Sequence, residues 1–176
     1  MKSYGHHHWK LNQTIYKMNL GIISIGKLKN SPLLELQNDY KKRILKLGKN
    51  IGINNLQIKE GLISKKNSID ARKIEEGEFF EKNLSKESYN IFLDETGDQC
   101  NSFEVSELLS NKLMDSPEMV FFIGGPDGFK KEILSQSDKV ISFGRVTWPH
   151  MLLRIMLLEQ LYRAVTIIKN HPYHRN

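Results

Sequence analysis

Two adjacent glycines, Gly124 and Gly125, open a segment whose residue types could bind a ligand. The segment spans 123–128 and reads Ile-Gly-Gly-Pro-Asp-Gly. Glycines lack a Cβ, so the backbone can approach a ligand closely and offer its amides. The spacing is not the G-x-G-x-x-G of dinucleotide folds and lacks the Lys-Ser/Thr of a phosphate loop, which disfavours NAD and ATP. A flat adenine or a sulfonium cofactor would suit this segment, and a tight strand-to-helix turn is the alternative.

A second segment, 143–150, combines aromatic, basic and proline residues in a stretch that precedes a predicted helix. Such a loop could wrap around a ligand. Pro149 also fits the entry to a helix. His150 suits a cap or a packing position as well as it suits a catalytic one.

The end of the chain brings together side chains that can titrate, stack and bind phosphate: His171, Tyr173, His174 and Arg175. Tyrosine can stack on an unpaired base, arginine can bind phosphate, and histidine can transfer a proton. Contact with RNA is one interpretation of this tail. A disordered terminus is the other.

Short apolar runs precede the first two segments and alternate with helical patterns along the chain. Strands are predicted at 20–25, 56–58, 89–93, 119–123 and 140–143, and helices at 31–48, 68–84, 101–113, 130–137 and 151–168. This alternation predicts an α/β protein with a mainly parallel sheet covered by helices on both faces. Ligands of such sheets bind at the carboxyl ends of the strands. Those ends carry 93–97, 124–128 and 144–149.

The last predicted helix is apolar around most of its circumference. Charged or polar residues at Arg154, Glu159, Gln160 and Arg163 interrupt it and argue against a membrane span. One sheet face cannot cover so broad an apolar surface. We therefore expect this helix to be shared between the sheet and a subunit interface, with burial in a large core as the alternative.

Length and composition predict one folded domain. Its basic charge favours a polyanionic partner, and a basic protein that binds no nucleic acid is the alternative. The 176 residues include 26 Lys and Arg against 20 Asp and Glu, a net charge of +6, with 39% hydrophobic residues. The single cysteine, Cys100, excludes an intramolecular disulfide and a Cys-rich zinc site, which favours a reducing compartment. Residues 1–17, with His6 to His8, are expected to be a leader or an added extension before a domain at 18–176.

In combination, these segments resemble a known family of enzymes. The resemblance covers Met18 to the end and is carried by Leu93-Asp94, 123–128, 147–150, Arg154, 159–164 and 170–175. In this order they are similar to the SPOUT-class pseudouridine N3-methyltransferases, the ribosomal RNA large subunit methyltransferase H family. The resemblance implies a deep trefoil knot in the C-terminal half, a homodimer, and S-adenosyl-L-methionine bound in the knot as methyl donor.

The same resemblance assigns roles to individual residues. Arg154, Tyr173, His174 and Arg175 are implied on the RNA side, with His174 as the preferred general base and the tail reaching the partner's cofactor site. Two positions depart from the usual pattern: Trp148 stands where Leu or Phe is common, and Asp127 where Glu or Asn is frequent. The implied cofactor-binding residues are Leu93, Gly124, Gly125, Phe143, Gly144, Arg145, Val146, Thr147 and Trp148.

The implied activity is methylation of N3 of a pseudouridine in 23S ribosomal RNA, on the assembled ribosome in the cytoplasm. The reaction needs no metal and no covalent intermediate, so Cys100 is not expected to act as a nucleophile. Two alternatives stay open: a knotted methyltransferase for another rRNA or tRNA nucleotide, and a non-catalytic ribosome-binding factor.

Overall fold

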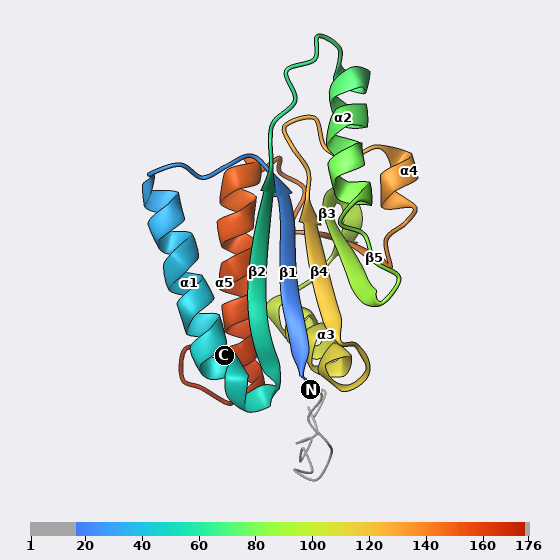
Figure 1. The fold of residues 1–176 in the computed structure, drawn as a ribbon. Helices are drawn as coiled ribbons and strands as arrows, with labels where there is room; N and C mark the ends of the chain where they lie inside the picture. Colours follow the sequence, from blue (N-terminus) through green and yellow to red (C-terminus); the bar gives the residue numbers. More distant parts are fainter. Residues whose placement is uncertain (1–16, 175–176) are drawn as a thin grey trace.

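Five parallel strands form the central sheet of the structure, a computed structural model that describes residues 17–174 (Figure 1). The strands are β1 (Met18–Ile25), β2 (Ile53–Gly61), β3 (Ser88–Gln99), β4 (Glu118–Ile123) and β5 (Lys139–Ser142). Their order in the sheet is β2-β1-β4-β3-β5, and every neighbouring pair is parallel. The predicted α/β class with a parallel sheet is confirmed.

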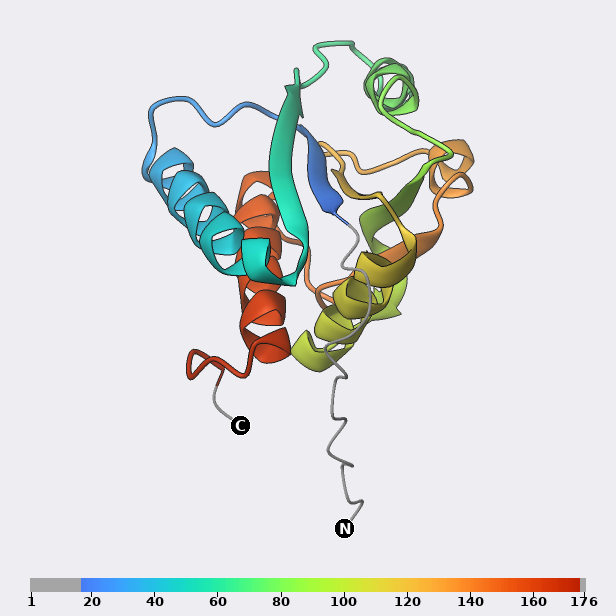
Figure 2. The ribbon, with the colours of Figure 1, turned by 60° about the horizontal axis from the view of Figure 1, so that its bottom comes forward.

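Helices cover both faces of the sheet (Figures 1 and 2). They are α1 (Pro32–Gly48), the 3-10 turn η1 (Lys49–Ile51), α2 (Ile69–Glu81), α3 (Ser102–Asp115), α4 (Lys131–Leu134) and α5 (His150–Ile168). On β1, Leu20 and Ile22 face the core beneath α1, α3 and α5, and Ile23 and Ile25 face the core beneath α2 and α4. Burial on both faces explains why the inner strands β1 and β4 are nearly continuous apolar runs, whereas the edge strand β2 contains several polar residues.

Capping residues set the predicted helix starts. The Ser31 hydroxyl accepts from the Leu34 amide at 3.4 Å, with Pro32 in the first turn. Asn101 forms a capping box with Glu104, whose carboxylate accepts from the Asn101 amide at 2.7 Å. These local signals place the starts of α1 and α3 as predicted.

The third strand continues beyond residue 93, where the sequence predicted its end. After Leu93, β3 extends to Gln99, and both Leu93 and Asp98 pair with Ile141 of β5 across an irregularity in register. A Cβ at Gly97 would lie 2.7 Å from the backbone nitrogen of Ile141, so only glycine permits this approach. Residues 94–98 have turn-like composition, but their long-range pairing with β5 decides their structure.

The helix α5 lies between α1 and α3 on one face of the sheet (Figure 2). Tyr40 and Tyr162 bring α1 and α5 together, with ring centroids 6.1 Å apart. From α3, the Ser102 hydroxyl donates to the Gln160 side-chain oxygen at 2.7 Å. These neighbours bury most of the apolar circumference, so a subunit contact would use only the outward stripe that includes Leu152, which is 41% exposed. No helix within 17–174 is long and apolar enough to span a membrane.

Candidate active site

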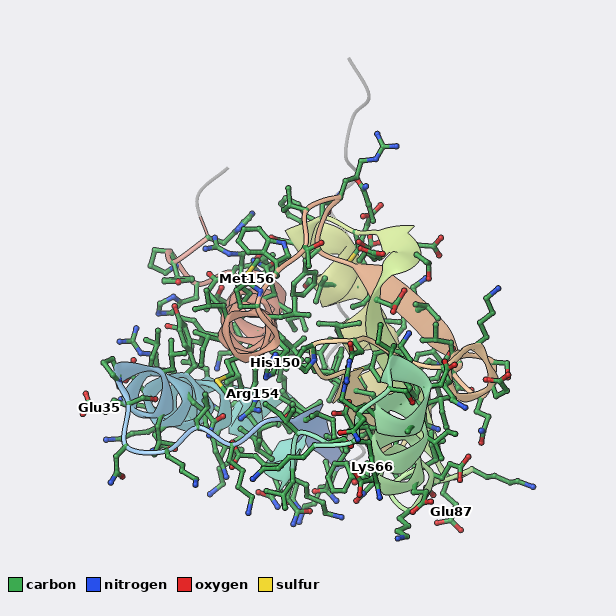
Figure 3. The ribbon with its side chains drawn as sticks, turned by 90° about the horizontal axis from the view of Figure 1, so that it is seen from above. Glu35, Lys66, Glu87, His150, Arg154 and Met156 are labelled. Carbon is green, nitrogen blue, oxygen red and sulfur yellow. The ribbon has the colours of Figure 1, made fainter. Side chains whose placement is uncertain are left out.

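The carboxyl ends of β3, β4 and β5 enclose a cavity of about 740 Å³. Figure 3 looks down on this edge of the sheet. The volume falls in the range of ~300–1,000 Å³ that is usual for small-molecule sites. The lining consists of 93–96, 124–129, 141–144 and 146–150, together with Lys73, Lys131, Leu134 and Leu153.

All of the predicted cofactor-binding residues except Arg145 line this cavity. The side chain of Arg145 is exposed instead. The prediction that three distant segments converge at one edge of the sheet agrees with the geometry, because parallel strands end at the same edge. Their role in binding a cofactor remains a prediction.

The glycine-rich segment makes a tight turn as well as one wall of the cavity. The Gly128 amide donates to the Gly125 carbonyl at 3.0 Å, and Gly128 has φ +72°. A Cβ at Gly124 would lie 3.2 Å from Gly128 backbone atoms, and one at Gly125 would lie 2.5 Å from Glu76 Oε2. The positive φ of Gly128 favours glycine in this turn, and Gly124 and Gly125 bring bare backbone to the cavity without these close contacts.

The segment 143–149 has no regular structure and is held by hydrogen bonds to its own backbone. The Ser142 hydroxyl donates to the Gly144 carbonyl at 2.9 Å, and the Trp148 indole N–H donates to the Phe143 carbonyl at 3.3 Å. Gly144 has φ +111°, which a side chain would strain. Val146 is 59% exposed and Trp148 is 40% exposed, so the loop presents apolar surface at the mouth of the cavity.

The cavity is lined by the carboxylates of Asp94, Glu95 and Asp127 and by the ammonium groups of Lys73 and Lys131. Asp94 accepts from the Thr96 amide at 3.0 Å, while neither Asp94 nor Glu95 forms an ion pair within the described part of the chain. Lys73 donates to the Phe129 carbonyl at 3.2 Å. Apolar walls, bare backbone and free carboxylates suit a flat ligand that carries positive charge. Among residues 17–174, no cluster of His, Cys, Asp and Glu could hold a metal ion.

A partly buried ionic network between α2 and the glycine-rich segment supports the cavity wall from behind. Arg72 forms a bidentate ion pair with Asp127, in which Nε donates to Oδ2 at 2.6 Å and Nη2 donates to Oδ1 at 3.1 Å. Glu76 is 3% exposed; its Oε1 accepts from the Ser64 amide at 3.0 Å and its Oε2 has no partner. Burial raises the pKa of Glu76, whereas the hydrogen bond from Arg72 lowers the pKa of Asp127. Sequence patterns missed Arg72, Lys73 and Glu76, because only tertiary packing brings α2 to this wall.

Arg154 lies inside the protein, which differs from its predicted position on the RNA side. Its side chain is fully buried, forms an ion pair with Glu60 and donates to the Gly26 carbonyl. Glu60 also accepts from the Leu28 amide at 2.9 Å. Direct contact between Arg154 and RNA is therefore corrected to a role inside the fold, where the guanidinium joins α5 to the ends of β1 and β2.

His150 lies one turn before Arg154 on the same side of α5 and lines the cavity (Figure 3). Its Nε2 is buried without a hydrogen-bond partner. Burial, followed by the nearby charge of Arg154, lowers the pKa of His150. A neutral imidazole is therefore the favoured form at this point of the cavity wall.

The tail packs along α5 and α3. The Tyr173 hydroxyl donates to Glu159 at 3.1 Å, and burial and this carboxylate raise its pKa to about 12. The His174 ring meets the edge of Phe103 at 4.7 Å between centroids, and both of its nitrogens are buried without partners. Within the described tail, 170–174, no residue lines the cavity. Arg175 and the histidine-rich leader lie outside the described residues.

Comparison with known proteins identifies the family to which the chain belongs. A family described as "Predicted SPOUT methyltransferase" matches residues 18–174. Proteins named ribosomal RNA large subunit methyltransferase H are 36% identical over 159 residues in Rhodopseudomonas palustris and 39% identical over 160 residues in Allorhizobium ampelinum. Each alignment covers 90% of this chain, and 99% or 100% of the relative. The similarity takes in every strand that shapes the cavity, and it shows that the chain is a methyltransferase of the SPOUT family.

Proposed function

We propose that this methyltransferase transfers the methyl group of S-adenosyl-L-methionine to N3 of a pseudouridine in 23S ribosomal RNA, on the assembled ribosome in the cytoplasm. The observation that carries the proposal is the single cavity made by 93–96, 124–129 and 146–150, in a chain related along nearly its full length to proteins named for rRNA methylation. The net charge of +6 agrees with an RNA substrate.

The residues around the cavity fit S-adenosylmethionine. Leu93, Phe143 and Trp148 offer apolar surface for an adenine, and Gly124 and Gly125 offer unobstructed backbone. The unpaired carboxylates of Asp94 and Glu95 suit a ligand with sulfonium and ammonium charges. When bound, this cofactor supplies a methyl group already activated by the sulfonium.

The remaining work for the protein is alignment and removal of a proton from N3. Alignment can account for ~7–11 kcal/mol of a barrier, and a general base typically contributes ~10²–10⁴ in rate. The loops around the cavity should therefore matter more than any single base. His174 is the proposed base, because its ring nitrogens have no partner. Tyr173, with a pKa of about 12, would act as a hydrogen-bond donor instead.

A second subunit is proposed to bring the tail to the cavity. Tyr173 is held at Glu159, which lies about 9 Å along α5 from the lining residue Leu153, at 1.5 Å per residue. The exposed apolar side chains of Val146, Trp148 and Leu152 near the cavity mouth favour a homodimer contact there. The trefoil knot belongs to the same proposal and rests on the match to the SPOUT family.

Transfer of labelled methyl groups to different RNAs tests the substrate class. Purified protein and labelled S-adenosylmethionine would be incubated with assembled ribosomes, protein-free ribosomal RNA and transfer RNA. The proposal predicts label on the large-subunit RNA of assembled ribosomes, with much weaker labelling of the free RNAs. Label on transfer RNA, or equal labelling of free and assembled ribosomal RNA, would contradict it. Binding to ribosomes without any binding of the methyl donor would favour a non-catalytic factor.

A further inference from the structure

The segment 62–67 leaves β2 at the same edge of the sheet as the cavity. In Figure 1 it rises above the sheet beside α2, and Figure 3 shows Lys66 on the face that carries His150. The sequence of this segment, Leu-Ile-Ser-Lys-Lys-Asn, contains no acidic residue. Leu62 is 72% exposed, and Lys65 and Lys66 are exposed beside it. None of residues 62–67 lines the cavity.

Although residues 62–67 form no helix or strand, hydrogen bonds to α2 hold the segment in position. The amide of Ser64, a residue only 8% exposed, donates to Glu76 at 3.0 Å, and its hydroxyl bonds to Glu75. The Lys66 amide donates to the Ser64 hydroxyl at 3.3 Å, and the Lys66 carbonyl accepts from Arg72 at 3.1 Å. A loop held in this way loses little conformational entropy when it binds a partner.

These hydrogen bonds engage carboxylates on α2 and leave the lysines of the segment exposed. The Glu75 and Glu76 carboxylates turn towards Ser64, and Asp127 is neutralised by Arg72. Neither Lys65 nor Lys66 takes part in an ion pair within residues 17–174. Two adjacent ammonium groups are therefore exposed, while the carboxylates of Glu75 and Asp127 are engaged by Ser64 and Arg72.

One arginine connects this segment to the cavity. Arg72 donates through Nη1 to the Lys66 carbonyl, and through Nε and Nη2 to Asp127, which lines the cavity. Glu76, which holds the Ser64 amide, packs its unpartnered oxygen against Gly125 on the same wall. The segment is therefore placed relative to the cavity by charged groups that have little freedom to move.

We propose that residues 62–67 form a phosphate-binding arm, which seats the RNA substrate through Lys65 and Lys66 while Arg72 and Glu76 hold it beside the cavity wall. This inference rests on the proposed function. Any RNA whose base enters the cavity carries its backbone phosphates past the same edge of the sheet. An acidic protein surface would meet the same two charges, but it gives no reason for the arm to be tied to the cavity wall.

A double substitution tests the arm. In Lys65→Gln/Lys66→Gln, the KM for assembled ribosomes should rise several-fold, whereas kcat and the affinity for S-adenosylmethionine should change little. The slope of log KM against log salt concentration should fall by about 1 to 2 units, since each lost phosphate contact removes ~0.7–0.9. Sedimentation with ribosomes, measured without the methyl donor, should show the same loss of salt dependence.

Lys46→Gln/Lys49→Gln is the matched control, because it removes the same charge from two exposed lysines at the opposite edge of the sheet. The control should keep the wild-type KM and salt dependence. Equal behaviour of both double variants, in methylation and in sedimentation, would overturn the arm. Loss of sedimentation with ribosomes but unchanged binding to protein-free ribosomal RNA would point to a protein partner and overturn it as well. If the wild-type protein binds ribosomes but methylates another RNA, the proposed function fails, and sedimentation still decides whether the arm binds phosphate.

Discussion

At the scale of single residues, the glycine-rich wall depends on the absence of a side chain at Gly125. A Cβ at Gly125 would lie 2.5 Å from Glu76 Oε2 and 3.0 Å from Ile25 Cγ2, distances too short for the wall to keep its shape. Gly77, on α2, has room: a Cβ there would lie 3.6 Å from Ile133 Cγ1. The two positions form a matched pair of crowded and permissive glycines.

Gly125→Ala should weaken binding of S-adenosylmethionine by about tenfold, or ~1.4 kcal/mol, because the cavity wall must shift to make room for the alanine side chain. Gly77→Ala should leave binding unchanged and stabilise α2 by ~0.5–1 kcal/mol. Isothermal titration calorimetry and thermal unfolding measure the two effects. Wild-type affinity in Gly125→Ala would show that the cofactor does not use this wall.

Glu76 should make stability depend on pH. Burial raises its pKa, so the folded protein keeps a proton that the unfolded chain releases above its ordinary value of 4.5. The stability linked to that proton is present below 4.5 and is lost as the pH rises through the raised pKa. The Gln side chain in Glu76→Gln cannot ionise. The free energy of unfolding of the variant, relative to that of the wild type, should therefore be higher at about pH 8 than at about pH 4. Urea unfolding of both proteins at the two pH values measures this change. A difference in free energy of unfolding that does not depend on pH would contradict the prediction.

At the scale of elements, α5 has its first turn at the cavity and its later turns beside the tail. Its Arg154 joins α1, β1 and β2 through Gln37, Gly26 and Glu60. Helical spacing placed Arg154 on α5 correctly. It could not show the partner, because Glu60 is 94 residues away in the chain.

Arg154→Met should lower the free energy of unfolding by an amount at the lower end of ~3–5 kcal/mol, because Glu60 loses its buried partner but keeps some contact with water. Arg163→Met, on the same helix, removes a surface pair with Glu159 and should cost under ~1 kcal/mol. Chemical denaturation compares the two variants. A stable Arg154→Met protein that has lost only RNA methylation would restore the predicted contact with RNA.

The same contrast explains how much of the structure the sequence could predict. Apolar runs and caps such as Ser31 and Asn101 act locally, so the order of the strands along the chain, the helix starts and the shared edge of the sheet followed from the sequence. The strand predicted at 56–58 spans Ile53–Gly61, because its polar residues join the strand through pairing with β1. The extension of β3 through Asp98 and the support of Gly125 by Glu76 depend on contacts between distant segments. No local pattern contains that information.

At the scale of the whole molecule, the described tail lies beside α5, apart from the cavity of its own chain. Mixing of inactive subunits tests whether a partner supplies it. Gly125→Val damages the cavity, and His174→Ala removes the proposed base. If sites form between subunits, random mixing of these variants should restore about a quarter of wild-type activity, because half of the dimers regain one of two sites. If each chain completes its own site, the mixture should stay inactive.

The most direct measurement of the central claim is the position of the transferred methyl group. Ribosomes from cells lacking the gene would be incubated with the protein and S-adenosylmethionine, and the methylated nucleotide would be mapped by mass spectrometry. The account predicts one new methyl group on N3 of a pseudouridine in the large-subunit RNA, which is absent when Gly125→Val replaces the wild type. A methyl group on another atom or nucleotide, or none at all, would contradict it.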